Sequence, residues 1–159
     1  MIYPLSQRFF SAFAGLLLFA MVFSATVGCQ TGIPAAKYPG PVDPDAPEEF
    51  TETASGLKYR ILRKGDGNNP TAADSVMCHY EGKLINGDVF DSSYTSGQPL
   101  TFSLRGVIPG WTEGMQYVRE GGMIELEVPS ELGYGKNGSP PVIPPDATLR
   151  FRVELIAIQ

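Results

Sequence analysis

Histidine and cysteine, the residue types most often found in metal sites and catalytic triads, are scarce in this chain, which has one histidine and two cysteines. His79 is the one histidine of the sequence, so a metal site built on imidazole would lack ligands. A hydrolytic triad would need His79 beside an activated serine and an acid. Ser92 and Ser93 follow Asp91, but the sequence contains no G-x-S-x-G nucleophile elbow. No metal site and no triad is therefore predicted, and His79 is expected to be structural.

Two further features could suggest a reactive site. Gly65-Asp66-Gly67 is glycine-rich, but it lacks the lysine and the strand-to-helix context of a phosphate-binding loop, so a turn is predicted. Cys78 lies between apolar residues and is expected to pack in the core. A disulfide between Cys78 and Cys29 is the alternative. None of these residues calls for a cofactor, and we expect none.

The segments that must position these residues are mostly strands. Alternation of apolar and polar residues is typical of half-buried strands, and it marks Leu57–Arg63, Ile124–Val128 and Leu149–Leu155. Val76, Cys78 and Tyr80 share one face of another predicted strand. Asn86-Gly87 predicts a hairpin leading into residues 89–91, and residues 100–103 form a further short strand candidate.

One helix is predicted. Pro109 suits its first turn, where a missing N–H is not needed. Trp111, Met115 and Val118 then form one apolar stripe, and Gly121-Gly122 is expected to end the helix. The fold class is therefore α+β, an antiparallel sheet with one short helix laid across it.

The segment from Gly138 to Asp146 reads GSPPVIPPD. It is too rich in proline for an interior strand. We expect an ordered surface loop that presents Val142 and Ile143.

Five short motifs follow one another over about a hundred residues. They are His79-Tyr80-Glu81-Gly82, Gly87 to Ser93 (GDVFDSS), Val107 to Gly114 (VIPGWTEG), Glu131 to Gly135 (ELGYG) and Ile143 to Phe151 (IPPDATLRF). In this order the motifs resemble those of FKBP-type peptidyl-prolyl cis-trans isomerases, over roughly Ser55 to Gln159. The resemblance implies a curved antiparallel sheet wrapped around one short helix. It assigns residues 54–159 to the isomerase domain.

The resemblance also implies a proline-binding pocket. Its expected catalytic residues are Asp91, Tyr134 and Phe90. Its expected substrate-binding residues are Tyr80, Leu100, Val107, Ile108, Trp111, Ile143 and Phe151. The family often binds immunosuppressive macrolides, which are therefore possible ligands.

Three positions depart from the family's pattern. Leu100 stands where the family often has an aromatic wall residue, which could shift substrate choice. Ser96 stands where many members carry an arginine that pairs with the pocket carboxylate, so Asp91 is expected to be held differently. Ser139 occupies a loop position that is often histidine.

Charge excludes some classes of partner. The chain has 159 residues and a formal net charge of −5. Arg8 is the one charged residue before Cys29, so removal of that segment would make the charge more negative still. This balance argues against nucleic-acid binding, and no basic run favours an anionic membrane surface.

The N-terminal residues predict export. Residues 9–28 are uncharged and rich in Leu, Phe and Ala, and Arg8 precedes them, as in a signal peptide spanning residues 1–28. Thr26-Val27-Gly28-Cys29 resembles a bacterial lipobox, although Thr26 replaces the usual aliphatic residue. We expect lipidation of Cys29, with an ordinary cleaved signal or an uncleaved anchor as alternatives. Each places the domain outside the cytoplasm, most simply tethered to a membrane in the periplasm.

Residues 29–53 are expected to form a linker behind the lipidated cysteine. Five prolines between residues 30 and 52 favour a stiff, extended spacer and disfavour a dimerisation helix. A monomer is therefore expected.

Two other functions compete with catalysis on proline-containing polypeptides. The same groove could serve as a non-catalytic chaperone or peptide-binding module, because fold alone does not establish turnover. A surface adhesion or assembly protein would draw only on the anchor and the acidic surface. Retention of the pocket aromatics and Asp91 favours the isomerase.

Overall fold

The computed structural model describes residues 35–159. The predicted signal segment, residues 1–28, and the predicted lipidation site, Cys29, lie outside the described residues. Within residues 35–159, no helix is long and apolar enough to cross a bilayer.

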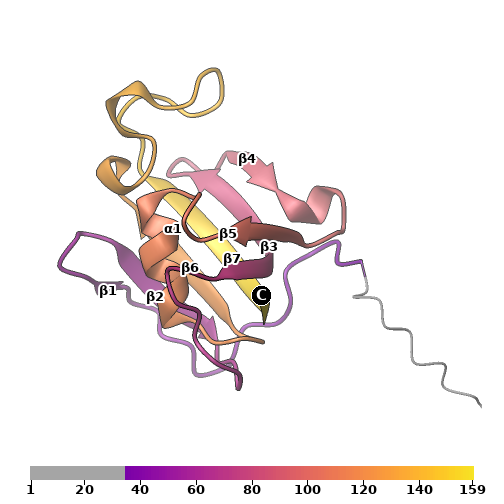
Figure 1. Cartoon of the computed structure of the whole chain (residues 1–159). Helices are drawn as coiled ribbons and strands as arrows, with labels where there is room; N and C mark the ends of the chain where they lie inside the picture. Colours follow the sequence, from indigo (N-terminus) through magenta and orange to yellow (C-terminus); the bar gives the residue numbers. More distant parts are fainter. Residues whose placement is uncertain (1–34) are drawn as a thin grey trace, which may run out of the picture. The chain divides into compact units, whose positions relative to one another are not determined.

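A seven-stranded antiparallel sheet forms the framework, as the alternating segments predict (Figure 1). Its strands are β1 (Thr51–Glu52), β2 (Lys58–Arg63), β3 (Ser75–Leu84), β4 (Val89–Ser92), β5 (Leu100–Ser103), β6 (Met123–Val128) and β7 (Leu149–Ile158). The order is β1-β2-β6-β7-β3-β4, and β5 also pairs with β3. The predicted antiparallel α+β class is confirmed.

Strand β3 organises the region around the site. On one side it pairs with β7 along its whole length. On its other side β5 pairs with residues 75–78, and β4 pairs with residues 81–83. The two short strands therefore follow each other along one edge of β3. Side chains from β4 and β5 can reach the same space above the sheet.

Helix α1 (Pro109–Gly114) packs on the sheet through two close approaches. A Cβ at Gly110 would lie 2.5 Å from Val128 Cγ1, and a Cβ at Gly114 would lie 2.6 Å from Leu126 Cδ2. Only glycine permits this contact with β6. The core formed beneath the helix contains Trp111 and Met115 together with apolar residues of β3, β6 and β7.

The end of the helix differs from the prediction. Residues Met115–Tyr117 form a 3-10 turn, and Val118 is extended with φ −104° and ψ 143°. The predicted stripe is buried, but the backbone leaves the helix before Gly121. Glu120 N–H instead donates to Asn68 O at 3.0 Å, and Gly121 N–H donates to Leu155 O at 2.8 Å. Bonds to neighbouring segments thus replace the last helical turn.

The proline-rich loop also differs in one respect. Val142 is half exposed, as expected, but Ile143 is only 5% exposed and belongs to the core. Ser139 and Ile143 exchange backbone hydrogen bonds of 2.8 and 2.9 Å, which fold the loop back on itself. The prediction that the loop presents Ile143 at the surface is wrong, because this turn directs it inward.

The predicted linker contacts the domain over its described part. Asp43 N–H donates to Leu62 O at 2.8 Å, and Arg60 donates to Glu48 O at 2.6 Å. The Phe50 ring lies beneath the Arg60 guanidinium, 4.8 Å from its centroid. Packing therefore continues N-terminal to the predicted boundary at residue 54.

Candidate active site

A cavity of about 460 Å³ opens where α1 faces the edge of β3. It is lined by Tyr80, Phe90, Asp91, Phe102, Gly106, Val107, Ile108, Trp111, Tyr134 and Phe151. Six of these ten residues are aromatic, and Asp91 is the one acid among them. The lining therefore offers an apolar interior with a carboxylate at one side.

Trp111 is the centre of the aromatic arrangement. It is 4% exposed, and three rings meet it edge to face with centroids 5.5 Å away: Tyr80, Phe102 and Phe151. Phe90 packs on Phe151 at 5.6 Å with an interplanar angle of 89°. Such edge-to-face pairs are favourable beyond the area that they bury. The rings thus form a pre-organised wall rather than side chains free to collapse into the cavity.

Gly82 makes room for two of these rings. A Cβ at this β3 position would lie 2.6 Å from Phe90 Cζ and 2.9 Å from Phe151 Cε1. Those separations are far shorter than a normal carbon–carbon contact of about 3.5–4.0 Å. The glycine of the His79-Tyr80-Glu81-Gly82 motif is therefore required by the shape of the cavity wall.

The one charged group of the lining is held by a neighbouring phenol. Tyr80 is buried, and its hydroxyl donates to Asp91 Oδ2. Burial and this bond to a carboxylate raise the pKa of Tyr80, so its hydroxyl stays protonated and remains a donor. Asp91 itself is exposed at the cavity edge, on β4. A fixed negative charge therefore faces whatever occupies the cavity.

Tyr134 supplies the other polar group at the rim. It follows the 3-10 turn Ser130–Leu132 and is 42% exposed. Its hydroxyl is thus accessible to a ligand. An apolar ring inside the cavity could contact Trp111 while its polar neighbours reach Tyr134 and Asp91.

Comparison with known proteins agrees with this geometry. Residues 67–156 match the family model described as FKBP-type peptidyl-prolyl cis-trans isomerase. The chain belongs to the FKBP family. A crystal structure of a peptidyl-prolyl cis-trans isomerase from Pseudomonas syringae pv. tomato has a TM-score of 0.66 and 36% identity. The match covers 71% of this chain and 83% of that one.

Two curated FKBP relatives are more similar in sequence. FkpA of Escherichia coli K12 is 50% identical over 115 residues, which is 72% of this chain and 42% of the relative. Its crystal structure matches with a TM-score of 0.68, covering 71% of this chain and 53% of that chain. Mip of Coxiella burnetii is 49% identical over 106 residues, 67% of this chain and 46% of the relative. The chain thus spans less than half the length of these curated relatives.

The FKBP cavity brings together most of the residues predicted from the sequence. Eight predicted residues line it: Tyr80, Phe90, Asp91, Val107, Ile108, Trp111, Tyr134 and Phe151. Two do not. Leu100 is 43% exposed outside the lining, and Ile143 is in the core. Leu100 and Ile143 were predicted to bind substrate, but neither lines this cavity.

Two lining residues, Phe102 and Gly106, were missed by the sequence reasoning. Phe102 lies two residues beyond Leu100 on β5 and contacts both Tyr80 and Trp111 edge to face. It provides an aromatic wall near the position at which Leu100 departs from the family pattern. Strand alternation offered a signal, because residues two apart share a face.

Ser96 stands where many family members carry an arginine, and here it does not bind Asp91. Ser96 Oγ donates to Ser93 O at 3.0 Å and so stabilises the turn after β4. Among the described residues, the ion pairs do not include Asp91. The Tyr80 hydroxyl is thus the contact that orients this carboxylate.

His79 lies on the opposite face of β3 from the cavity. It is buried, its Nδ1 is 2.9 Å from Ser93 Oγ, and its ring stacks on Tyr94 at 4.9 Å. Ser93 Oγ also accepts the Tyr80 N–H at 2.9 Å, so it is a buried structural hydroxyl. Cys78 is buried too, and burial raises the pKa of its thiol to about 12. Neither His79 nor Cys78 is part of the site.

His79 should make stability depend on pH. Burial lowers the pKa of its imidazole, against an opposing effect of Glu154. The unfolded chain therefore binds the proton more readily than the folded protein. The stability that neutral His79 contributes is fully present above pH 6.5 and is lost as the pH falls through the pKa of His79 in the folded protein. We expect the free energy of unfolding to fall between pH 7 and 5.5, with a slope of at most about 1.4 kcal/mol per pH unit.

Urea unfolding across this range measures that slope, and His79→Gln is the control that should flatten it. The proton NMR signal of the single histidine gives a second measurement. A titration midpoint above 6.5 in the folded protein would contradict the expected sign.

Proposed function

We propose that this protein is a peptidyl-prolyl cis-trans isomerase that assists the folding of exported polypeptides by rotating X–Pro bonds. The observation that carries the proposal is the Trp111 cavity, which combines a ring-lined apolar interior with a carboxylate at its edge. Its dimensions suit a proline ring with its flanking peptide. The FKBP relatives named above support the same activity.

The reaction requires no nucleophile and no cofactor. Amide resonance opposes rotation about the X–Pro bond with a barrier of about 18–20 kcal/mol, and no covalent bond is broken. A twisted amide is less polar than a planar one, because the nitrogen lone pair no longer delocalises into the carbonyl. An apolar cavity therefore disfavours the twisted state less than water does.

The residues divide the task accordingly. Trp111 and the rings around it hold the proline ring in place. The Tyr134 hydroxyl fixes the peptide by a hydrogen bond, while Asp91 interacts with the carbonyl group of the rotating amide. Catalysis requires tighter binding of the twisted state than of either planar state. An acceleration of about 10⁵-fold needs about 7 kcal/mol of such preference, which desolvation and a few oriented contacts can supply.

The competing function is that of a non-catalytic chaperone that grips proline-containing segments in the same groove. A proline-limited refolding assay separates the two. The isomerase accelerates the slow refolding phase, and Phe90→Ala reduces that acceleration. A protein that suppresses aggregation but leaves the slow phase unchanged would instead be a binding module.

We also propose that the mature protein is lipidated on Cys29 and tethered to a membrane in the periplasm. Support comes from the uncharged segment before Cys29 and from its resemblance to a lipobox. Mass spectrometry of the mature N-terminus should find a diacylglyceryl-modified Cys29 as the first residue. An unmodified residue 29, within an intact chain or after an ordinary cleavage site, would contradict this.

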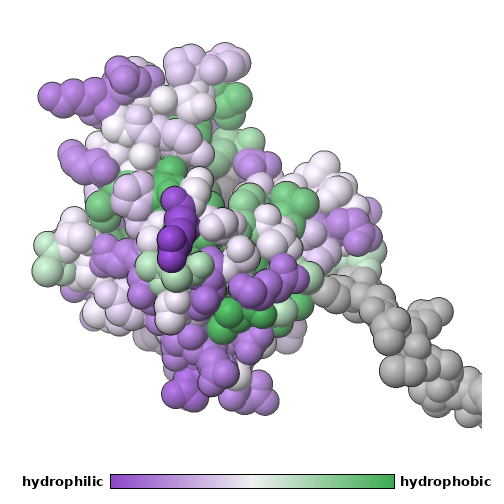
Figure 2. Space-filling view, in the orientation of Figure 1, coloured by the Kyte–Doolittle hydropathy of each residue, from purple (hydrophilic) through white to green (hydrophobic). Residues whose placement is uncertain are grey.

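We also propose that the protein is a monomer and that its cavity binds macrolides. A monomer is supported by the proline-rich segment 30–52, which disfavours a dimerisation helix. On the face seen in Figure 2, hydrophobic residues occur in groups among hydrophilic ones. Macrolide binding is supported by the apolar volume next to Tyr134 and Ile108. Light scattering and a macrolide titration would measure these two properties.

A further inference from the structure

The segment N-terminal to the sheet is bound to the domain at several points. We call residues 36–43 the strap. Ala36 N–H donates to Gly97 O at 3.0 Å, at one end of the strap. At the other end, Asp43 N–H donates to Leu62 O, and Asp43 Oδ2 accepts Lys64 N–H at 2.7 Å. The strap thus connects the turn after β4 with β2.

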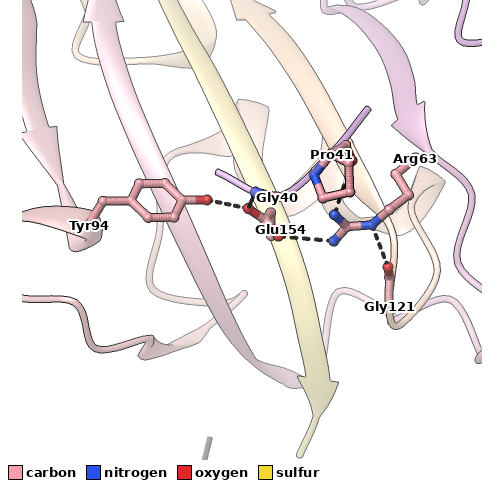
Figure 3. Close-up of polar contacts among 6 residues, drawn as sticks. All are labelled: Gly40, Pro41, Arg63, Tyr94, Gly121 and Glu154. Atoms are coloured by element: carbon pink, nitrogen blue, oxygen red, sulfur yellow. Dashed lines mark hydrogen bonds and ion pairs between the residues drawn. The ribbon is translucent and has the colours of Figure 1, made fainter. Parts of the chain in front are cut away.

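Glu154 on β7 holds the middle of the strap (Figure 3). Its Oε1 accepts Gly40 N–H at 2.7 Å, and its Oε2 accepts Arg63 Nη2 at 3.0 Å. Arg63 in turn donates to Pro41 O at 3.3 Å and to Gly121 O at 3.0 Å. Burial alone would raise the pKa of Glu154. Hydrogen bonds from Gly40, from Arg63 and from the Tyr94 hydroxyl outweigh burial and lower this pKa, so Glu154 is ionised at neutral pH.

The Glu154 Oε1 atom that binds Gly40 also binds the turn after β4, the strand that carries Asp91. Tyr94 O–H donates to Oε1 at 2.6 Å, so Gly40 and Tyr94 share one acceptor (Figure 3). Tyr94 belongs to the 3-10 turn Ser93–Thr95, which directly follows Asp91 and Ser92. Ala36 bonds the end of this turn at Gly97. The strap is therefore connected to the Asp91 wall at two places.

The other side of the turn is fixed to β3. Ser93 Oγ accepts Tyr80 N–H, and the Tyr80 hydroxyl holds Asp91. Tyr94 stacks on His79, the neighbour of Tyr80. Contacts thus run without a break from Gly40 through Glu154 and Tyr94 to the residues that orient the cavity carboxylate.

The strap itself is only loosely packed against β4. A hollow of about 630 Å³ separates strap residues Lys37 to Pro39 from Val89 and the Ser93–Thr95 turn. A segment held by a few hydrogen bonds and little apolar contact opens at low free-energy cost. Tyr38 and Val42 of the strap are 72% and 44% exposed, so they add little apolar contact, and we expect the strap to open within the folded protein.

We propose that Glu154 and Tyr94 are positioning residues for the isomerase reaction, and that strap docking through them fixes the wall bearing Asp91. This inference rests on the proposed function. Because linkage between two sites is reciprocal, occupancy of the cavity also stabilises the docked strap. Through Glu154 and Tyr94, the segment that follows the predicted anchor is thus connected to the part of the cavity wall that bears Asp91.

The test uses the mature chain with its N-terminal segment and a proline tetrapeptide as substrate. Tyr94→Phe removes the hydroxyl but keeps the ring on His79. Gly40→Val acts from the strap side, since a Cβ there would lie 2.7 Å from Arg63 Nη1 and 3.1 Å from Glu154 Oε2. Each variant should lower kcat/KM by about fivefold or more. Glu154→Gln, which keeps an acceptor, should lose less than Glu154→Leu.

Tyr117→Phe is the matched control. This ring also stacks on another, Tyr59 at 4.3 Å, and within residues 35–159 its hydroxyl makes no hydrogen bond to the strap. Its loss of a hydroxyl should leave kcat/KM unchanged. Circular dichroism at the assay temperature must show every variant folded, so that an altered folded fraction does not account for a lower rate.

Trypsin cleavage after Lys37, which is exposed within the strap, reports docking directly. Saturating tetrapeptide should slow this cleavage in the wild type and have little effect in Tyr94→Phe or Gly40→Val. Variants that are cleaved faster but retain wild-type kcat/KM would overturn the proposal, as would wild-type cleavage that the peptide does not alter.

If the wild type binds the peptide without turnover, the proposed activity fails. The strap is then judged by the variants' Kd for the same peptide.

Discussion

Replacing Asp91 by valine should lower kcat/KM for a proline peptide by about 10- to 100-fold. Asp91 is the one acid in the cavity lining, and valine removes its charge while leaving the buried Tyr80 hydroxyl without its acceptor. The expected loss is moderate because Asp91 is exposed and water screens its charge. Peptide isomerisation kinetics with each variant measures it.

Two variants make this prediction specific. Asp91→Asn keeps an acceptor for Tyr80 and should lose less than Asp91→Val. Asp88→Asn changes an exposed acid in the hairpin before β4, where it accepts the Asn86 amide at 2.8 Å, and should retain wild-type activity. Equal losses at positions 88 and 91 would show a general effect of charge rather than a role for the cavity carboxylate.

Truncation of Leu126 to alanine should have the largest effect on stability, about 3–5 kcal/mol. Leu126 is fully buried on β6, and it contacts the helix backbone at Gly114. Alanine would leave a void between sheet and helix that the close glycine contacts cannot fill. Urea unfolding with linear extrapolation measures the change.

Leu100→Ala is the matched control for Leu126→Ala. It removes the same atoms from a side chain that is 43% exposed, and it should cost less than about 1 kcal/mol. Similar losses at the two positions would contradict the packing of α1 on β6 described above.

The sequence predicted the parts of the fold that local patterns encode. Alternation of apolar and polar residues marked β2, β6 and β7. In β7 buried and partly buried residues alternate accordingly, whereas β6 is buried on both faces. It could not predict where the helix ends, since that depends on bonds from residues 120 and 121 to Asn68 and Leu155. Such long-range partners leave no periodic signal.

The same limit applies around the site. The family motifs identified eight lining residues, but Phe102 lies between motifs and was missed. The proline-rich composition of residues 30–52 indicated an extended segment. It did not indicate that Gly40 would bind Glu154, 114 residues away. Glu154 itself looked like a solvent-facing position of an alternating strand, because the strap and Tyr94 that cover it are distant in sequence.

NMR exchange spectroscopy of a short proline peptide, with the wild-type protein added at a small fraction of the peptide concentration, tests directly whether the protein catalyses rotation about X–Pro bonds. Uncatalysed exchange takes about 10–100 s, too slow to give exchange cross-peaks. We predict cross-peaks between the cis and trans signals that grow with protein concentration and are strongly reduced with Asp91→Val. Spectra that stay unchanged with the folded wild-type protein would contradict the claim that the Trp111 cavity catalyses rotation about X–Pro bonds.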